Sequence, residues 1–273
     1  MYADYPKPTD HEFALYQELI KRRLGIFLPS HKKPLLCNRL NKRLFARQVD
    51  DFGSYFQLIN HIDEESELKL ALELITTNET YFFREPKHFD YLQREVLRQH
   101  NGLSKFRVWS AASSSGEEPY SIAMLLDDRC KGPWEIMASD INSQMLDHAG
   151  EGIYIDSRTK GIPSEYRQRY CLKGIGKFEG QLRIIPKIRQ SVSFKKINLI
   201  ESMPDIGLFD LIFLRNVMIY FDRDTQVDVL NNVRRSLNPD GLLYLSHSES
   251  LQGVSDDFLL VKPAIYRVAN SRQ

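Results

Sequence analysis

The sequence has few cysteines and almost no net charge, and each of these features excludes a class of protein. Its 273 residues include three cysteines, Cys37, Cys130 and Cys171, which lie far apart and form no CxxC pair. This pattern predicts reduced thiols in a cytosolic protein and excludes a disulfide framework or a cysteine zinc site. With 37 basic and 36 acidic residues the formal net charge is +1, so the total charge favours no particular partner.

Targeting signals and long apolar runs are missing as well. The N-terminus lacks a basic start followed by an apolar core, and runs such as Leu211–Leu214 are far too short to span a bilayer. We therefore expect a cytoplasmic protein without direct membrane insertion. Its 42% hydrophobic and 11% aromatic residues are typical of a packed globular chain. Its length suits one α/β domain with a small companion domain.

Charge is distributed unevenly in the first third of the chain. Residues 19–49 contain nine basic residues and no acidic one, whereas residues 50–85 contain nine acidic residues and two basic ones. Such asymmetry predicts a basic surface that meets an acidic partner.

The first 75 residues carry only helix signals. Thr9 and Glu12 fit a capping box before an apolar series at helical spacing, which stops at Gly25. Three more helices are expected, over residues 34–48, 54–60 and 66–75. In the first of these, leucines at positions 36, 40 and 44 form one stripe, flanked by basic residues. We predict a small helical N-terminal domain over residues 1–75, with a basic helix at 34–48.

After residue 75, short apolar runs alternate with helical segments, which is typical of a parallel α/β sheet covered on both faces. We therefore expect a Rossmann-like sheet in a second domain, residues 76–273, ending in an antiparallel hairpin. A glycine-containing region at about 170–194 breaks the alternation and predicts a small antiparallel β insertion. The expected strands are 106–109, 134–138, 192–194, 208–214 and 242–245, and the expected helices are 119–128, 143–150 and 224–237.

The exit of the first expected strand carries the strongest ligand signal. There a strand, a turn of small residues with Gly116, and a helix follow one another, as at nucleoside sites of α/β sheets. The turn, which lets a ligand approach the backbone, has neither the GxGxxG nor the Walker pattern, so a cofactor without phosphates, such as S-adenosylmethionine, fits better. Asp140 ends the next strand and can accept both hydroxyls of a ribose. Alternatively it caps the following helix, but the nearby Gly116 turn favours the ribose interpretation.

Polar residues also follow the strand expected at 208–214. Arg215 and Asn216 either hydrogen-bond nearby backbone or line the ligand edge of the sheet, and the position favours the second interpretation. Tyr220, taken alone, is more typical of a core residue. His247 lies between two serines, but the chain has no GxSxG elbow, so we interpret it as a structural or site-lining group.

Taken together, seven blocks of this sequence resemble the CheR family of chemoreceptor glutamate methyltransferases. They occur in order along nearly the whole chain, and their joint occurrence is highly specific. One departure, Ser114-Ser115 where many relatives have a Ser-Thr pair, is conservative. The blocks are Thr77–Glu85, Ser110–Ser121, Ala138–Asp140, Asn198–Leu199, Arg215–Phe221, Pro239–Leu242 and His247–Glu249.

The resemblance implies an S-adenosyl-L-methionine-dependent methyltransferase that esterifies glutamate side chains of methyl-accepting chemotaxis receptors and releases S-adenosyl-L-homocysteine. It implies no metal, and it places Arg84 and Tyr220 beside the transferred methyl group as catalytic residues. Its implied cofactor contacts are Asn78, Thr80, Arg84, Glu118, Asp140, Asn198, Leu199, Arg215 and Asn216.

The resemblance also implies partners. The main one is the cytoplasmic helical bundle of transmembrane chemoreceptors, so recruitment to receptor clusters at the inner membrane is expected. In some members the β-subdomain docks on a short peptide at the receptor's C-terminus, and here Gly174 and Gly176 keep that loop at full length. The basic helix supplies Arg39, Lys42, Arg43 and Arg47 to meet an acidic receptor face; the alternative is an ordinary solvated surface.

This reaction needs no general base, because a glutamate with a pKa of about 4.3 is already ionised at neutral pH. Negative carboxylate and positive sulfonium neutralise each other, so alignment in a site of low polarity favours the transition state. We expect Arg84 to orient a carboxylate, either the cofactor's or the substrate's, and Tyr220 to supply a hydrogen bond and a ring wall.

Two other functions fit parts of the sequence. An RNA or small-molecule methyltransferase would share the fold, but the stretch Arg39–Arg47 offers only Phe45 for stacking on bases, so no nucleic-acid partner is expected. A non-catalytic sensor would bind the cofactor without turnover, yet it would not need Arg84 and Tyr220.

Overall fold

The protein forms two compact units in a computed structural model that describes residues 6–269. The helical unit contains the chain up to Thr77 together with the segment Tyr220–Thr225, and the sheet unit contains Asn78–Ile219 and the chain from Gln226 onward. No helix among residues 6–269 is long and apolar enough to cross a membrane.

The helical unit confirms the helices expected from the sequence. The Thr9 hydroxyl accepts the Glu12 N–H at 3.2 Å, the Glu12 carboxylate accepts the Thr9 N–H at 2.6 Å, and Gly25 ends the first helix at φ 71°. The predicted leucine stripe of the second helix is buried. The elements are α1 Asp10–Leu24, η1 Ser30–Lys32, α2 Lys33–Arg47, α3 Phe52–Ile59, η2 Ile62–Glu64 and α4 Glu65–Ile75.

The segment Tyr220–Thr225 joins the helical unit, although it is far from the other residues of that unit in sequence. The Phe27 N–H donates to the Tyr220 carbonyl at 2.8 Å, and Lys21 Nζ lies 2.6 Å from Asp222 Oδ2. The sequence-based boundary places this segment in the second domain, because pairing across such a separation leaves no local pattern.

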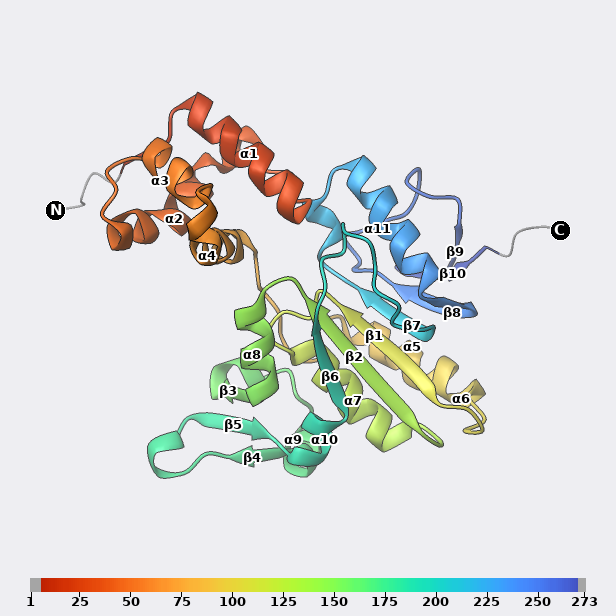
Figure 1. Ribbon diagram of the computed structural model, residues 1–273. Coiled ribbons are helices and arrows are strands. Elements are labelled where there is room, and N and C mark those ends of the chain that lie inside the picture. The colour runs from red at the N-terminus through yellow and green to blue at the C-terminus, as the bar shows by residue number, and fades with distance from the viewer. Residues whose placement is uncertain (1–5, 270–273) are drawn as a thin grey trace. The chain divides into compact units, whose positions relative to one another are not determined.

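The sheet unit is built on a seven-stranded sheet of order β6-β2-β1-β7-β8-β10-β9 (Figure 1). The first five strands in this order run parallel and the last two pair antiparallel. The predicted Rossmann-like sheet and terminal hairpin are thus confirmed. The strands are β1 Phe106–Ala111, β2 Trp134–Asp140, β6 Val192–Lys196, β7 Phe209–Leu214, β8 Leu237–Tyr244, β9 Phe258–Lys262 and β10 Ile265–Val268.

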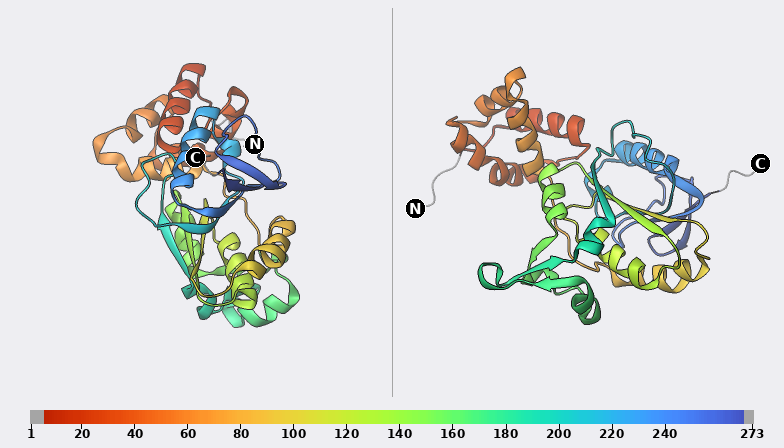
Figure 2. Two further views of the ribbon diagram at one scale, coloured as in Figure 1. Left: turned by 90° about the vertical axis from the view of Figure 1, so that its right-hand side faces the viewer. Right: turned by 60° about the horizontal axis from the view of Figure 1, so that its bottom comes forward.

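Helices cover both faces of this sheet, as expected from its near-continuous apolar strands. Helices α5, α6 and α7 lie on one face and α11 lies on the other (Figures 1 and 2). The helical stretch 86–99 was not predicted, because it is divided into short pieces around a π-turn. The remaining elements are α5 Pro86–Tyr91, η3 Leu92–Val96, α6 Leu97–Gln99, α7 Glu117–Arg129, α8 Ser143–Glu151, η4 Asp156–Thr159, α9 Ser164–Tyr170, η5 Gly176–Phe178, α10 Pro186–Gln190, η6 Met218–Tyr220 and α11 Arg223–Arg235.

A small antiparallel sheet of order β3-β5-β4 is inserted in the sheet unit and lies apart from the main sheet in Figure 1. This confirms the predicted β insertion, but the boundaries differ from 170–194. The insertion begins with β3 (Ile153–Ile155) and continues with β4 (Cys171–Lys173) and β5 (Gln181–Ile184), whereas β6 belongs to the main sheet. Three residues are too few to show alternation, so β3 becomes visible only through its pairing with β5.

Candidate functional site

The candidate site lies at the carboxyl edge of the main sheet. Strands β6, β2, β1 and β7 are neighbours and run parallel, so the residues after them meet at one edge. Asp140 ends β2, the Gly116 turn follows β1, Arg215 follows β7, and Asn198 comes shortly after β6. The structure thus brings together residues that the sequence analysis selected separately, at the edge where α/β sheets bind ligands.

Asp140 connects the Gly116 turn to the second strand. Its Oδ2 accepts the Ser114 N–H at 2.8 Å and its Oδ1 accepts the Asn142 N–H at 2.9 Å. The cap of α8 is Asn142, whose side chain accepts the Met145 N–H at 3.2 Å. The interpretation of Asp140 as the cap is therefore wrong. A carboxylate oxygen can accept more than one hydrogen bond, and the ribose role of Asp140 stays a prediction.

Gly116 is needed for packing. It has φ 93°, and a Cβ there would lie 2.8 Å from Ala149 Cβ and 3.0 Å from Tyr154 Oη. A side chain would therefore push α8 and β3 away from the turn. This differs from the expected role of leaving room for a ligand at the glycine itself.

The segment 78–84 borders the same turn. The Ser114 hydroxyl donates to the Asn78 carbonyl at 3.2 Å, and Arg158 Nη2 donates to the Thr80 carbonyl at 3.4 Å. The Arg84 guanidinium donates to the Glu79 carbonyl at 3.0 Å and lies over the Tyr81 ring, 5.3 Å from its centroid.

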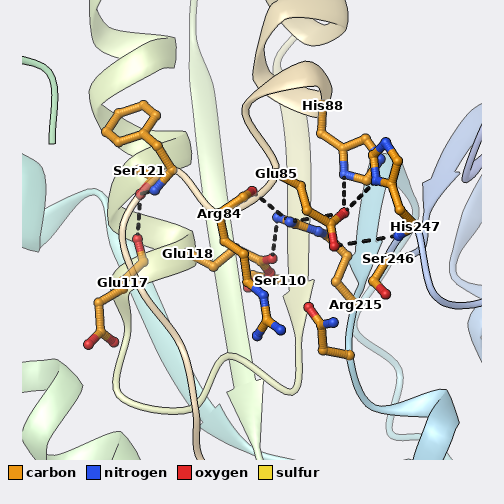
Figure 3. Close-up of polar contacts among 12 residues, drawn as sticks. Arg84, Glu85, His88, Ser110, Glu117, Glu118, Ser121, Arg215, Ser246 and His247 are labelled. Atoms are coloured by element: carbon orange, nitrogen blue, oxygen red, sulfur yellow. Dashed lines mark hydrogen bonds and ion pairs between the residues drawn. The ribbon is translucent and has the colours of Figure 1, made fainter. Parts of the chain in front are cut away.

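Arg215 is a buried hub of this site. It is 5% exposed, and Figure 3 shows its guanidinium between Glu118 and Glu85. Nη1 donates to Glu118 Oε2 at 3.0 Å, and Nη2 donates to the Arg84 carbonyl at 2.6 Å and lies 3.3 Å from Glu85 Oε2. Arg215 therefore fixes the backbone of the Arg84 segment against β7 and α7.

Glu118 completes this hub. Its Oε1 accepts the Ser110 hydroxyl at 2.6 Å, while Arg215 occupies Oε2. Burial raises the pKa of Glu118 even though Arg215 and Ser110 both favour its charged form. A positively charged ligand group near this carboxylate would stabilise the charged form further.

The remaining predicted cofactor residues lie in loops after β6 and β7. The Asn198 amide donates to Glu201 Oε1 at 2.8 Å, and the Leu199 carbonyl accepts the Asn232 amide at 3.0 Å. Asn216 has φ 58° and donates its backbone N–H to Glu249 Oε2 at 2.9 Å. Arg84 belongs to the sheet unit and Tyr220 to the helical unit, so their joint role stays a prediction.

A second cluster next to Arg215 consists of Glu85, His88 and His247, which the sequence analysis did not assign as a group. Glu85 Oε2 lies 2.9 Å from His247 Nδ1 and 3.3 Å from His88 Nδ1 (Figure 3). These atoms are close enough to consider a metal site. However, the centroids of the two imidazole rings lie 4.7 Å apart with the rings tilted by 31°, and the Arg215 guanidinium lies against the same Glu85 oxygen. This arrangement suits a carboxylate shared among cationic and imidazole groups better than a bound cation.

His88 makes stability depend on pH. Burial, followed by the charge of Arg215, lowers the pKa of His88 from 6.5 to about 3. The unfolded chain therefore binds a proton here at higher pH than the folded protein, so stability falls as pH decreases below 6.5.

We expect this histidine alone to remove about 2 kcal/mol of unfolding free energy between about pH 7 and pH 5. Urea unfolding of His88→Gln should show a correspondingly weaker loss over that range, while the exposed control His11→Gln should follow the parent protein. Equal pH slopes for all three proteins would contradict this assignment.

Glu117 is a buried carboxylate in an ion pair that the sequence did not reveal. It is fully buried, its Oε2 accepts the Ser115 hydroxyl at 2.7 Å, and Arg158 Nη2 lies 2.5 Å from its Oε1. Arg158 comes from η4, directly after β3, so it links the β insertion to the Gly116 turn and, through the Thr80 carbonyl, to the segment 78–84. The sequence could have drawn attention to Glu117, because two adjacent glutamates follow the turn glycine. No local pattern identifies Arg158 as its partner.

Two of the four basic residues expected at the receptor surface are paired with acidic residues within the helical unit. Arg43 binds Glu67 through two bonds of 2.9 and 2.6 Å, and Arg47 pairs with Glu64. Burial alone would raise the pKa of Glu67, but hydrogen bonds from Arg43 and Tyr55 and the charges of Arg43 and Arg47 keep it below its ordinary value.

Arg39 and Lys42, unlike Arg43 and Arg47, make no ion pair that the structure shows among residues 6–269. Arg39 donates to the carbonyls of Leu74 and Thr76, each at 3.2 Å. Lys42 is exposed on α2, beside Phe45, whose side chain is 85% exposed. The solvent-facing part of α2 is therefore less charged than the sequence suggested.

The loop between β4 and β5 contains both glycines of the predicted peptide-docking segment. A Cβ at Gly174 would lie 1.9 Å from the Phe178 carbonyl oxygen, so only glycine fits there, and Gly176 has φ 59°. Beside them is a groove of about 210 Å³ lined in part by Leu172, Ile175 and Phe178, all of which are exposed. β4 is an edge strand of the small sheet.

Comparison with known proteins gives matches along nearly the whole chain. Residues 11–76 match the family model described as "CheR methyltransferase, all-alpha domain", and residues 78–266 match "CheR methyltransferase, SAM binding domain". Three curated relatives carry the names "Chemotaxis protein methyltransferase" or "Chemotaxis protein methyltransferase 2". The protein from Salmonella typhimurium is 40% identical over 97% of this chain and 92% of its own length. Those from Escherichia coli and Pseudomonas aeruginosa are each 39% identical over 96% of this chain, and over 92% and 94% of their own lengths.

Proposed function

Because this chain belongs to the CheR methyltransferase family, whose cofactor is S-adenosyl-L-methionine, we propose that it methylates glutamate side chains of methyl-accepting chemotaxis receptors. The products are glutamate methyl esters and S-adenosyl-L-homocysteine. The observation that carries the proposal is the similarity to chemotaxis methyltransferases over nearly the whole chain, together with the polar groups that converge at the carboxyl edge of the sheet.

Three side chains of this edge, those of Asp140, Glu118 and Arg84, would bind and orient the reactants, and Tyr220 of the helical unit is proposed as a fourth. Asp140 accepts the ribose hydroxyls, and the Glu118 carboxylate compensates positive charge on the amino-acid part of the cofactor. Bound S-adenosyl-L-methionine supplies a sulfonium methyl group. Arg84 orients a carboxylate, and Tyr220 contributes its hydroxyl and ring beside the reacting atoms. The glutamate arrives ionised, so these residues need only align and desolvate it.

The helical unit supports the receptor part of the proposal. Lys42 and Phe45 give α2 an exposed surface with a cation beside an aromatic ring, which fits the side of an acidic helical bundle. Arg39, which is held by two backbone carbonyls, adds positive potential. The charges of Arg43 and Arg47 are offset by Glu67 and Glu64.

Lys42→Glu is expected to raise the KM for receptor about three- to tenfold with a smaller change in kcat, because reversing an exposed charge mainly weakens encounter. The parent KM should rise with salt, and that of Lys42→Glu should depend less on salt. Initial rates at several salt concentrations check this, with Lys131→Glu, an exposed residue of the sheet unit, as the control. A KM that neither the salt nor Lys42→Glu changes would contradict a receptor contact at α2.

The β insertion supports docking of an extended peptide at the receptor's C-terminus. An edge strand offers free main-chain hydrogen-bonding groups, and alternate side chains of an added strand could fill the groove beside Ile175 and Phe178. Such tethering raises the local concentration of receptor glutamates near the site without changing the chemistry.

The proposal is tested by incubating the purified protein with methyl-labelled S-adenosyl-L-methionine and receptor-containing membranes, or with RNA in a parallel reaction. Base-labile label on the receptor band is the expected result, because carboxyl methyl esters hydrolyse in base. Receptors without their C-terminal residues should be labelled more slowly if the peptide docks. Label on RNA, or cofactor binding without any turnover, would overturn the proposal.

A further inference from the structure

The segment Ser246–Glu249, shortly after β8, contacts two separate turns of the candidate site. Glu249 is 8% exposed, and its carboxylate accepts three backbone N–H groups. Oε2 accepts those of Asn216 and Ser246, each at 2.9 Å, and Oε1 accepts that of Ile219 at 3.3 Å. Two of these three donors belong to the turn after β7, which supplies the predicted cofactor residues Arg215 and Asn216.

That turn needs support from outside itself. Asn216 has φ 58°, a left-handed conformation that residues other than glycine adopt infrequently. The N–H groups around a single helical turn such as η6 also have no helical partners of their own. A carboxylate that accepts several of them stabilises this conformation through charge-assisted hydrogen bonds.

The same segment holds the other turn through His247. His247 Nδ1 lies 2.9 Å from Glu85 Oε2, and the His247 backbone N–H donates to Glu85 Oε1 at 3.4 Å. Glu85 directly follows Arg84 and also has a positive φ, 58°. Residues 246–249 therefore hydrogen-bond both to Glu85, next to Arg84, and to the turn Arg215–Ile219, and so connect these two turns to the segment after β8.

We propose that Glu249 is a positioning residue for methyl transfer. It orients the Arg215–Ile219 turn, and through it the Asn216 side chain and the chain leading into Tyr220, while touching neither cofactor nor substrate itself. This inference rests on the proposed use of Asn216 and Tyr220 in the reaction.

The test compares Glu249→Ala, Glu249→Gln and the exposed control Glu95→Gln, each under conditions where it is fully folded. Glu249→Ala should weaken S-adenosyl-L-homocysteine binding about tenfold and lower kcat more than it changes the KM for receptor. Glu249→Gln retains one acceptor oxygen, which can still bind the N–H groups of Asn216 and Ser246, so it should recover most of both losses. Amide hydrogen exchange at Asn216 should be faster in Glu249→Ala than in the parent and in Glu249→Gln. The Ile219 amide, whose acceptor Oε1 is lost in both variants, should exchange faster in both.

The outcomes separate this inference from the proposed function. If the parent protein does not methylate receptors, the proposed function fails, but faster exchange and weaker S-adenosyl-L-homocysteine binding in Glu249→Ala would still support positioning by Glu249. If folded Glu249→Ala keeps the parent kcat, S-adenosyl-L-homocysteine affinity and exchange rates, or if Glu249→Gln is as impaired as Glu249→Ala, the inference is overturned.

Discussion

Arg215→Met should destabilise the protein by about 3 kcal/mol and abolish measurable methyl transfer, because it removes the cation between two largely buried carboxylates. Glu118 and Glu85 would then face each other across the space that the guanidinium occupies, and the Arg84 carbonyl would lose its donor. Urea unfolding gives the change in stability, and receptor methylation measured on the folded fraction gives the change in activity.

A second substitution separates the stability cost of an unpaired buried charge from the loss of the contacts that Arg215 makes. Adding Glu118→Gln to Arg215→Met should recover part of the lost stability, because one unpaired buried carboxylate disappears. Activity should not return, because the Arg84 carbonyl still lacks its hydrogen bond from residue 215. The Glu118 carboxylate, which is proposed to face the cofactor, is also gone. The exposed control Arg98→Met should leave both measurements unchanged. An Arg215→Met protein as stable and active as the parent would show that the contacts of Arg215 with Glu118, Glu85 and the Arg84 carbonyl contribute neither to stability nor to activity.

Asp140→Ala is expected to weaken S-adenosyl-L-homocysteine binding about 100-fold or more, because hydrogen bonds to a charged group contribute about 1.5–3 kcal/mol each. Asp140 would accept two ribose hydroxyls, and it also fixes the Ser114 N–H of the Gly116 turn. Calorimetric titration with S-adenosyl-L-homocysteine measures this directly and does not depend on receptor.

Asp140→Asn and Asp90→Ala are the informative companions. Asparagine keeps one acceptor oxygen and should lose less affinity than alanine, while the exposed Asp90 should be replaceable without effect. If Asp140→Ala binds as tightly as the parent protein, the ribose is held elsewhere and the assignment of Asp140 is wrong.

Local patterns predicted most of the fold. The Thr9 capping box, the Gly25 stop and the buried stripe of α2 are short-range features whose physics lies within a few residues. The parallel strands were visible because both of their faces are buried, which makes them continuously apolar. The same logic located Asp140 and Arg215, since polar residues directly after such strands must lie at the ligand edge of the sheet.

Long-range pairing explains what sequence alone did not provide. A run of basic residues on α2 indicates a basic surface, but Arg43 meets Glu67 on α4, and this contact depends on how the helices pack. Arg158 and Glu249 likewise act through partners far away in the chain. Tyr220 lies in an apolar run, and its backbone bond to Phe27 could not be inferred from either neighbourhood.

We propose that residues at the carboxyl edge of the sheet deliver a cofactor methyl group to ionised receptor glutamates. The most direct measurement is peptide mapping by mass spectrometry of chemoreceptors from cells that contain or lack this protein. We predict base-labile mass increments of one methylene on specific glutamates, present only when the protein is present and lost with Asp140→Ala. Receptors with the same glutamate methyl esters in both kinds of cell would contradict it.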